Sequence, residues 1–304
     1  MIASSLLPPT LPADRVIACI GLISDTHLPQ RLAALPPAVF TALEGVDFLL
    51  HAGDVGTLTV LDQLSAIAPV IAVHGNDDTP LAQAELPYQQ VITCHGQRIL
   101  LWHSHFVDRI DELDSRRHDG PGRLRSQLER PLARARRCGA RVVVFGHWHI
   151  PLVYQAPDVL VINPGALASG NPYTRQLRQT VALLFLRDDG EPFVSHIDLT
   201  APDRIYTPAI DWSASFSTAA LPFSASILTP HLEANLDYLR EQFARFGFDH
   251  ALSPWLRVAH RCWGGEQATI TLADLLAEVR TDPELSAGRK AQYETILANL
   301  PITA

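Results

Sequence analysis

The chain has 304 residues, of which 47% are hydrophobic and 18% charged, and its formal net charge at pH 7 is −8. This length predicts one large domain or two unequal domains with a substantial core, and the hydrophobic content excludes a wholly disordered chain. The negative charge gives no general attraction for nucleic-acid phosphates, although bound cations could still attract a phosphorylated substrate.

Cysteine spacing and hydropathy predict a cytoplasmic protein without a membrane span. No apolar run reaches the roughly 18 residues that a spanning helix needs. The N-terminal residues 1–15 lack the features of a signal peptide and are expected to form a loose tail. The cysteines form no CxxC pair and are interpreted as reduced thiols; they are Cys19, Cys94, Cys138 and Cys262.

The first part of the chain alternates strand and helix patterns. Val16 to Ile23 is mostly apolar and predicts a buried strand, and two prolines at 36 and 37 open a helix that Gly45 can close. Further strands are expected over 46–50 and 70–73, with a helix between them. Polar residues directly follow each strand, which is where ligands bind in open α/β sheets.

The middle of the chain predicts more strands. Residues 88–102 are typical of a hairpin and 142–145 of a buried strand, while 152–162 and 181–197 are expected to form a second sheet packed on the first. Residues 106–121 show no apolar face and predict a long loop near the site. Residues 123–138 have helical spacing that Pro131 interrupts.

The character of the sequence changes after residue 200. Residues 201–228 are rich in Pro, Ser, Thr and Ala and predict a linker or an irregular wrap over the body. Four capped helical patterns then predict a small helical domain over 229–304. This domain could cap the site and select substrates, or form a homo-oligomer contact.

Five short segments place Asp, Asn or His side chains directly after apolar runs. Side chains two residues apart on a strand point to the same face, so an Asp and a His in that spacing can bind one cation. One such pair alone is more simply a turn with a surface histidine, but five strand ends predict one shared metal site. The segments are Asp25-Thr26-His27, His51-Ala52-Gly53-Asp54, His74-Gly75-Asn76-Asp77-Asp78, His103-Ser104-His105 and Gly146-His147-Trp148-His149.

With these five segments, residues 16–200 resemble the calcineurin-like metallophosphoesterase family, and within it the small bacterial and archaeal phosphodiesterases. The resemblance implies an α/β fold, a four-layer α-β-β-α sandwich of two mixed sheets, to which the C-terminal helices form an appendage. It also implies two divalent metal ions, with Mn expected first and Fe, Zn or Ni as alternatives. By motif position, Asp25, His27, Asp54 and His149 would hold one ion, and Asp54, Asn76, His103 and His147 the other.

The implied activity is hydrolysis of a small-molecule phosphate ester, more specifically a phosphodiester, by a hydroxide that bridges the two metals. Asp54, Asn76 and His74 are the residues expected to take part in catalysis. Asp77 stands where many larger phosphatases of the family carry a histidine that protonates the leaving group. The proton would then come from His74, His51, Asp77 or water.

Two other functions stay open. The same fold occurs in scaffold proteins with degraded metal sites, but here no ligand of the motifs is missing. A nuclease is the third hypothesis, against which the acidic charge and the lack of a basic, aromatic-rich stripe argue. The expected partner is therefore a small phosphate ester rather than a nucleic acid or a membrane.

Overall fold

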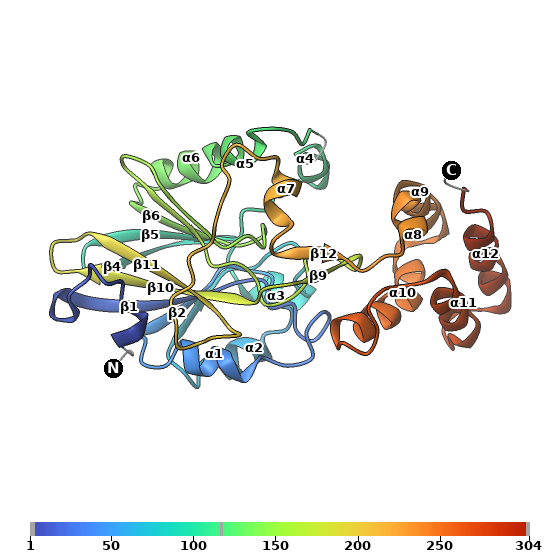
Figure 1. The fold of residues 1–304 in the computed structure, drawn as a ribbon, viewed down its shortest axis with the longest axis horizontal. Helices are drawn as coiled ribbons and strands as arrows, with labels where there is room; N and C mark the ends of the chain where they lie inside the picture. Colours follow the sequence, from blue (N-terminus) through green and yellow to red (C-terminus); the bar gives the residue numbers. More distant parts are fainter. Residues whose placement is uncertain (1–3, 116–117, 302–304) are drawn as a thin grey trace. The chain divides into compact units, whose positions relative to one another are not determined.

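The computed structural model describes residues 4–115 and 118–301, which fall into two compact units (Figure 1). The first, the sandwich unit, comprises Met1–Gly170 and Gln176–Ser224. The second, the helical unit, comprises Asn171–Arg175 and Ala225–Ala304. In the described ranges, no helix combines the length and the apolar character that crossing a bilayer requires.

The first sheet of the sandwich unit has the strand order β11-β10-β1-β2-β3. Its strands are β1 (Val16–Ile23), β2 (Phe48–His51), β3 (Val70–Ala72), β10 (Thr180–Arg187) and β11 (Pro192–Asp198). The strands β1, β2 and β3 run parallel, whereas β10 and β11 join antiparallel on the other side of β1. The carboxyl ends of three parallel strands therefore lie at one end of this mixed sheet.

The second sheet has the order β4-β5-β6-β8-β7. Its strands are β4 (Gln89–Cys94), β5 (Gln97–Trp102), β6 (Val142–Phe145), β7 (Leu152–Gln155) and β8 (Leu160–Asn163). Here β5, β6 and β8 are parallel, and β4 and β7 are antiparallel to their neighbours. The prediction that the strands over 181–197 belong to this sheet is wrong, because β10 pairs with β1, with Leu184 opposite Ile20.

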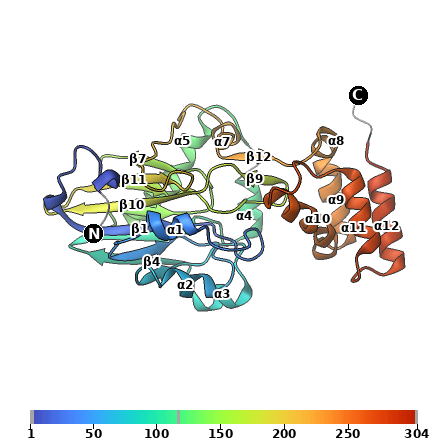
Figure 2. The ribbon, with the colours of Figure 1, turned by 60° about the horizontal axis from the view of Figure 1, so that its bottom comes forward.

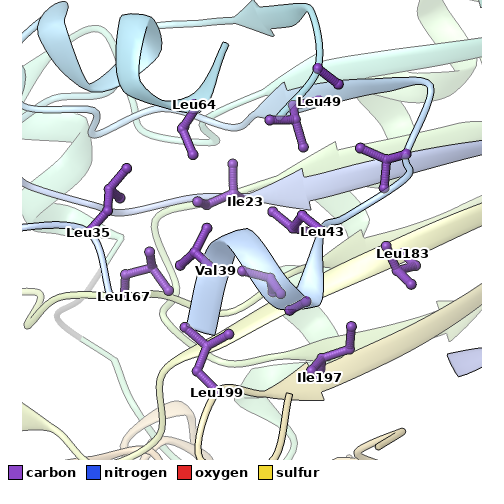
Figure 3. Packing of buried hydrophobic residues seen from close by; sticks show 14 of the residues in the cluster. Ile23, Leu35, Val39, Leu43, Leu49, Leu64, Leu167, Leu183, Ile197 and Leu199 are labelled. Atoms are coloured by element: carbon purple, nitrogen blue, oxygen red, sulfur yellow. The ribbon is translucent and has the colours of Figure 1, made fainter. Parts of the chain in front are cut away.

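Helices cover the outer faces of both sheets (Figure 1). The helices α1 and α2 pack on the first sheet through Val39, Leu43 and Leu64, which meet Ile23 and Leu183 (Figure 3). The helices α5 and α6 pack on the second sheet. The helices of this unit are α1 (Pro37–Ala42), α2 (Thr59–Leu64), α3 (Pro80–Glu85), α4 (Arg109–Asp114), α5 (Arg123–Gln127), α6 (Glu129–Arg137) and α7 (Phe216–Ala220), with short 3₁₀ turns at Ser4–Leu6 and Ala13–Arg15.

Alternate residues of the strands divide between the inner and outer faces of the sheets. In β1, Ile20 and Leu22 pack between the sheets, whereas Cys19 and Ile23 pack against the helices. Both faces of the strand are covered, which explains its continuous apolar sequence. The predicted four-layer α-β-β-α sandwich is confirmed.

Two local predictions are wrong. The expected loop over 106–121 contains α4, whose start is capped by Asp108, since Oδ1 accepts a hydrogen bond from the backbone N of Ile110 (2.7 Å). The helix break falls at Leu128 rather than at Pro131. Pro131 instead lies in the first turn of α6, where its missing N–H leaves no helical hydrogen bond unmade.

Segments at both ends of the sandwich unit attach to its cores. Leu6 and Leu11, in the expected tail, are buried in the same cluster as α1 and α2. From the segment expected to be a linker or wrap, Ala219 and Phe223 are buried with α5 and α6, and Trp212 packs against the same cluster. These residues are thus part of the hydrophobic cores of the sandwich unit.

The helical unit has a core of its own. Buried Phe243, Trp255 and Tyr293 lie at its centre, and α10 packs on α9 and α11 (Figure 2). Thr271 and Asp274 form a capping box that fixes the start of α11. The elements are α8 (Pro230–Ala234), α9 (Leu236–Phe246), α10 (Phe248–Trp263), α11 (Leu272–Thr281) and α12 (Ala287–Ala298); the unit boundary falls at the short paired strands β9 (Thr174–Gln176) and β12 (Ser224–Ser226).

Candidate metal centre

The five polar segments converge at the carboxyl ends of β1, β2, β3, β5 and β6. Their candidate ligand atoms form three groups, and within each group the atoms lie within 4.8 Å of one another. Two of the groups share His27 and two share Asp54, so the groups are continuous. The groups are Asp25 with His27 and His149, Asp54 with His103 and His147, and His27 with Asp54 and Asp77.

Most of the predicted ligands have an unusual backbone conformation. A positive φ in a residue other than glycine is uncommon and costs about 1–3 kcal/mol, although Asp and His tolerate it better than most residues. Such strain clusters at functional sites, where it aims side chains that a regular strand end would turn elsewhere. The predicted ligands with positive φ are Asp25, His27, Asp54, His147 and His149, at 45° to 72°.

Glycines let neighbouring segments approach the two carboxylates. A Cβ on Gly75 would lie 2.1 Å from Oδ1 of Asp54, and a Cβ on Gly146 would lie 2.9 Å from Oδ2 of Asp25. The backbone that follows each glycine holds the carboxylate in place. The N–H of Asp77 donates to Asp54 Oδ1 (2.8 Å), and the N–H of His147 donates to Asp25 Oδ2 (3.0 Å).

Backbone carbonyls fix the orientation of two imidazoles. The Nδ1–H of His103 donates to Ala52 O (2.8 Å), and the Nδ1–H of His149 donates to Ala168 O (3.0 Å), because a carbonyl oxygen can only accept. Their Nε2 atoms then face carboxylates, at 3.1 Å from Asp54 Oδ2 and 3.0 Å from Asp25 Oδ1. In a neutral ring this nitrogen is also an acceptor, so each contact requires a proton or a cation between the two atoms.

The electrostatics of the site favour bound positive charge. Burial lowers the pKa of His103, but the negative charges of Asp54 and Asp25 outweigh burial and raise this pKa to about 10. Burial raises the pKa of Asp54, but the charge of His103 and the hydrogen bonds from His103 and from the N–H of Asp77 bring it well below its usual range. A metal ion that binds here displaces the proton from His103.

His27 and Asn76 are suited to bind a metal as neutral ligands. Burial, helped by the charge of Arg31, lowers the pKa of His27 to about 3. The amide of Asn76 donates through Nδ2 to Asp77 Oδ1 (2.7 Å), and its buried Oδ1 has no hydrogen-bond partner among the described residues. Such an amide oxygen, on a side chain next to the carboxylate of Asp77, fits a cation site.

Glu112, to which no motif of the sequence points, contacts the expected ligand His147. Nε2 of His147 donates to Glu112 Oε1 (2.8 Å), and Glu112 Oε2 accepts from the N–H of Phe106 (2.9 Å). Only 3% of Glu112 is exposed. A carboxylate on the far nitrogen of a metal-binding imidazole fixes the tautomer and raises the basicity of the ring.

Arg31 is a second residue beside the expected ligands that no motif of the sequence indicates. Its NH2 group donates to Asp77 Oδ2 (2.6 Å) and its NH1 group donates to Ser169 O (3.1 Å). The same NH1 lies 3.4 Å from Nδ1 of His27. The only signal in the sequence is an arginine four residues after the first histidine.

His51, His74 and His105 lie outside the three ligand groups found among residues 4–115 and 118–301. Nε2 of His51 contacts Thr26 Oγ1 (3.1 Å), and burial lowers the pKa of His51 to about 4. The ring of His74 lies against those of His105 and Tyr88, at centroid distances of 5.6 and 5.8 Å. His74, expected to be catalytic, thus lies outside the ligand groups, and its expected role stays a prediction.

Comparison with known proteins agrees with this geometry. Residues 19–189 match the family model described as the calcineurin-like phosphoesterase superfamily domain. A probable metallophosphoesterase of Methanothermobacter thermautotrophicus is 33% identical over 178 residues, which is 59% of this chain and 90% of that protein. A phosphodiesterase of Methanocaldococcus jannaschii is 30% identical over 151 residues, 48% of this chain and 82% of that protein.

Solved structures with a related arrangement include Vps29 of Chaetomium thermophilum, which is 20% identical with a TM-score of 0.43 and matches 60% of this chain and 93% of its own. A predicted phosphoesterase of Streptococcus pneumoniae is 19% identical with a TM-score of 0.41, and the match covers 62% of this chain and 92% of that one.

Proposed function

The chain belongs to the calcineurin-like phosphoesterase superfamily, and we propose that it is a phosphodiesterase that uses two divalent metal ions to hydrolyse a small phosphate ester. The observation that carries the proposal concerns His103 and His149. In each neutral ring Nδ1 carries the proton, which it donates to a backbone carbonyl, so the unprotonated Nε2 faces a carboxylate. Seven side chains on five strand ends supply the ligands.

The residues present fit two adjacent cations. We assign Asp25, His27, Asp54 and His149 to one ion and Asp54, Asn76, His103 and His147 to the other. Asp54 is suited to bridge them, because its Oδ2 lies 3.1 Å from Nε2 of His103 and 3.5 Å from Nε2 of His27. With Nε2 committed to Glu112, His147 would offer Nδ1 to its ion.

The donor set favours Mn, Fe, Zn or Ni, since it mixes imidazole nitrogens with carboxylate and amide oxygens; we propose Mn. Divalent cations held there would supply Lewis acidity for the phosphate and lower the pKa of the attacking water. Other groups of the chain hold the proposed ligands in place. Backbone N–H groups hold the two carboxylates, and backbone carbonyls and Glu112 hold the imidazoles.

The surroundings of Asp77 support a diester rather than a monoester as substrate. Asp77 stands in place of the histidine that protonates the leaving group in larger phosphatases of the family, and both of its carboxylate oxygens already accept hydrogen bonds, from Asn76 and from Arg31. A site without that acid favours esters whose leaving group needs little protonation. The curated relative named a phosphodiesterase is consistent with this choice.

The test is a metal analysis followed by a substrate panel. Purified protein is stripped, reloaded with Mn, Fe, Zn, Ni or Mg, and assayed with matched mono- and diesters of the same aryl alcohol. We expect hydrolysis that depends on the added metal and is faster with the diester. Equal hydrolysis in the presence of a chelator contradicts metal dependence, and faster cleavage of the monoester contradicts the diester assignment.

A further inference from the structure

Arg31 lies at the accessible edge of the metal centre. Its backbone N–H donates to the carbonyl oxygen of His27 (2.9 Å), which keeps the arginine one turn away from the ligand. The exposed fraction of the side chain is 15% for Arg31 and 33% for Asp77, against 3% for His27. A substrate that arrives from solvent therefore reaches Arg31 and Asp77 before the buried ring of His27.

The contacts of Arg31 hold it more firmly than those of an ordinary surface ion pair. Exposed pairs contribute little because solvent screens them and both side chains lose freedom. Here the guanidinium is fixed on one side by Asp77 and on the other by Ser169 O, beside the ring of His27. The hydrogen bonds to Asp77 and Ser169 use two of its five N–H donors, and NH1 also contacts the ring of His27. The donors of a guanidinium match the oxygens of a phosphate.

The charge of Asp77 explains how a guanidinium can lie next to cations. Two bound divalent ions would repel Arg31, because like charges a few ångströms apart repel each other even in a hydrated site. The carboxylate of Asp77, at 2.6 Å from Arg31, offsets that repulsion. The pair thus keeps a positive hydrogen-bond donor at the edge of the centre.

We propose that Arg31 binds the non-bridging oxygens of the substrate's phosphate, and that Asp77 is the positioning residue that holds Arg31 for this contact. The inference rests on the proposed function and deepens it, since it identifies how a phosphate group is recognised beside the metals. Arg31 acts as a hydrogen-bond donor and gives up no proton, and the leaving group takes its proton from water.

The test measures binding of inorganic phosphate by titration calorimetry, with the metal content of each sample determined in parallel. In Arg31→Met, phosphate binding to Mn-loaded protein becomes roughly 10- to 100-fold weaker, the size expected for losing charge-assisted hydrogen bonds. The metal content stays that of the wild type. Arg31→Lys keeps the charge but loses the fork, so its loss is smaller.

Arg178→Met is the matched control, because Arg178 pairs with Asp198 at 2.6 Å in the same unit but touches no ligand group. Its phosphate affinity stays unchanged. Asp77→Asn weakens phosphate binding as well, and Arg31→Met combined with Asp77→Asn is no worse than Arg31→Met alone, since both changes remove the same contact.

Three outcomes overturn the inference in distinguishable ways. If phosphate affinity is unchanged in both Arg31→Met and Arg31→Lys while the wild type still hydrolyses the ester, the role of Arg31 is contradicted but the proposed function is not. Loss of metal in Arg31→Met shows that Arg31 supports His27 instead of the phosphate. A wild type that binds neither Mn nor phosphate and hydrolyses no ester overturns both this inference and the proposed function.

Discussion

Nε2 of His147 donates a hydrogen bond of 2.8 Å to Oε1 of Glu112, and this contact joins α4 to the metal centre. The other carboxylate oxygen of Glu112 accepts from the N–H of Phe106, so the segment before α4 is tied to the same group. The segment predicted to be a loop thus contains a residue that contacts His147, one of the proposed ligands.

Removing this support should weaken metal binding. We expect Glu112→Gln to lower the affinity for the more weakly bound Mn ion about 10- to 100-fold, because an amide no longer fixes the tautomer of His147 as a carboxylate does. Titration calorimetry with Mn measures the effect. Asp111→Asn, an exposed change on the same helix, is the control, and equal Mn affinity in all three proteins would show that Glu112 is dispensable.

The convergence of the five polar segments could be predicted from the sequence, because each segment directly follows an apolar strand. Asp25 and His27, for example, mark the end of β1 without any knowledge of the partner segments. Glu112 could not be found in this way, because it follows no apolar run and its partner His147 lies 35 residues away in the sequence. Arg31 was missed because its partner Asp77 is 46 residues away.

The sheet assignment of β10 shows a second limit. All residues of β10 except Arg187 are buried, so the apolar pattern reports burial but does not choose between two neighbouring sheets. The choice depends on the antiparallel pairing with β1, which is a long-range contact.

Asp54→Asn should separate activity from folding. The amide keeps the size of the side chain but removes the negative charge of the residue assigned to both metal ions. We therefore expect metal occupancy to fall and hydrolysis to drop by more than about 100-fold. Circular dichroism should show an unchanged fold. Asp211→Asn, at an exposed position, serves as the control, and full activity of Asp54→Asn after reloading with Mn would refute the shared role.

Gly75→Ala should disturb the same carboxylate through packing. The added Cβ would lie 2.1 Å from Asp54 Oδ1 and 2.6 Å from the backbone N of Asp54, so Asp54 or the segment at Gly75 must move. We expect a loss of activity of at least about 10-fold, since small displacements of reacting groups are costly. Gly120→Ala, where no atom of the described residues lies within 4 Å of the new Cβ, should retain activity in the same assay.

His196 should make the stability of the protein depend on pH. Its Nε2 donates to Asn163 O (2.7 Å), and burial lowers the pKa of His196 to about 4 in the folded protein. The unfolded chain binds this proton near pH 6.5, so the stabilising contribution is present above pH 6.5 and is lost as the pH falls from 6.5 to 4. The loss amounts to about 3 kcal/mol.

The measurement is urea unfolding of metal-free protein at pH 7, 6, 5 and 4.5, compared with His196→Gln, which keeps a donor but does not titrate. We expect the variant to lose less stability on acidification than the wild type, because the other buried histidines contribute equally to both. If the free energy of unfolding falls equally with pH in both proteins, His196 is not buried in its neutral form.

Anomalous diffraction from a crystal of the Mn-loaded protein tests the central claim most directly. The account predicts two Mn peaks about 3.5–4 Å apart, with Asp54 between them and His103 and His149 bound through Nε2. A map with the seven side chains ordered but with no Mn peak among them would contradict it.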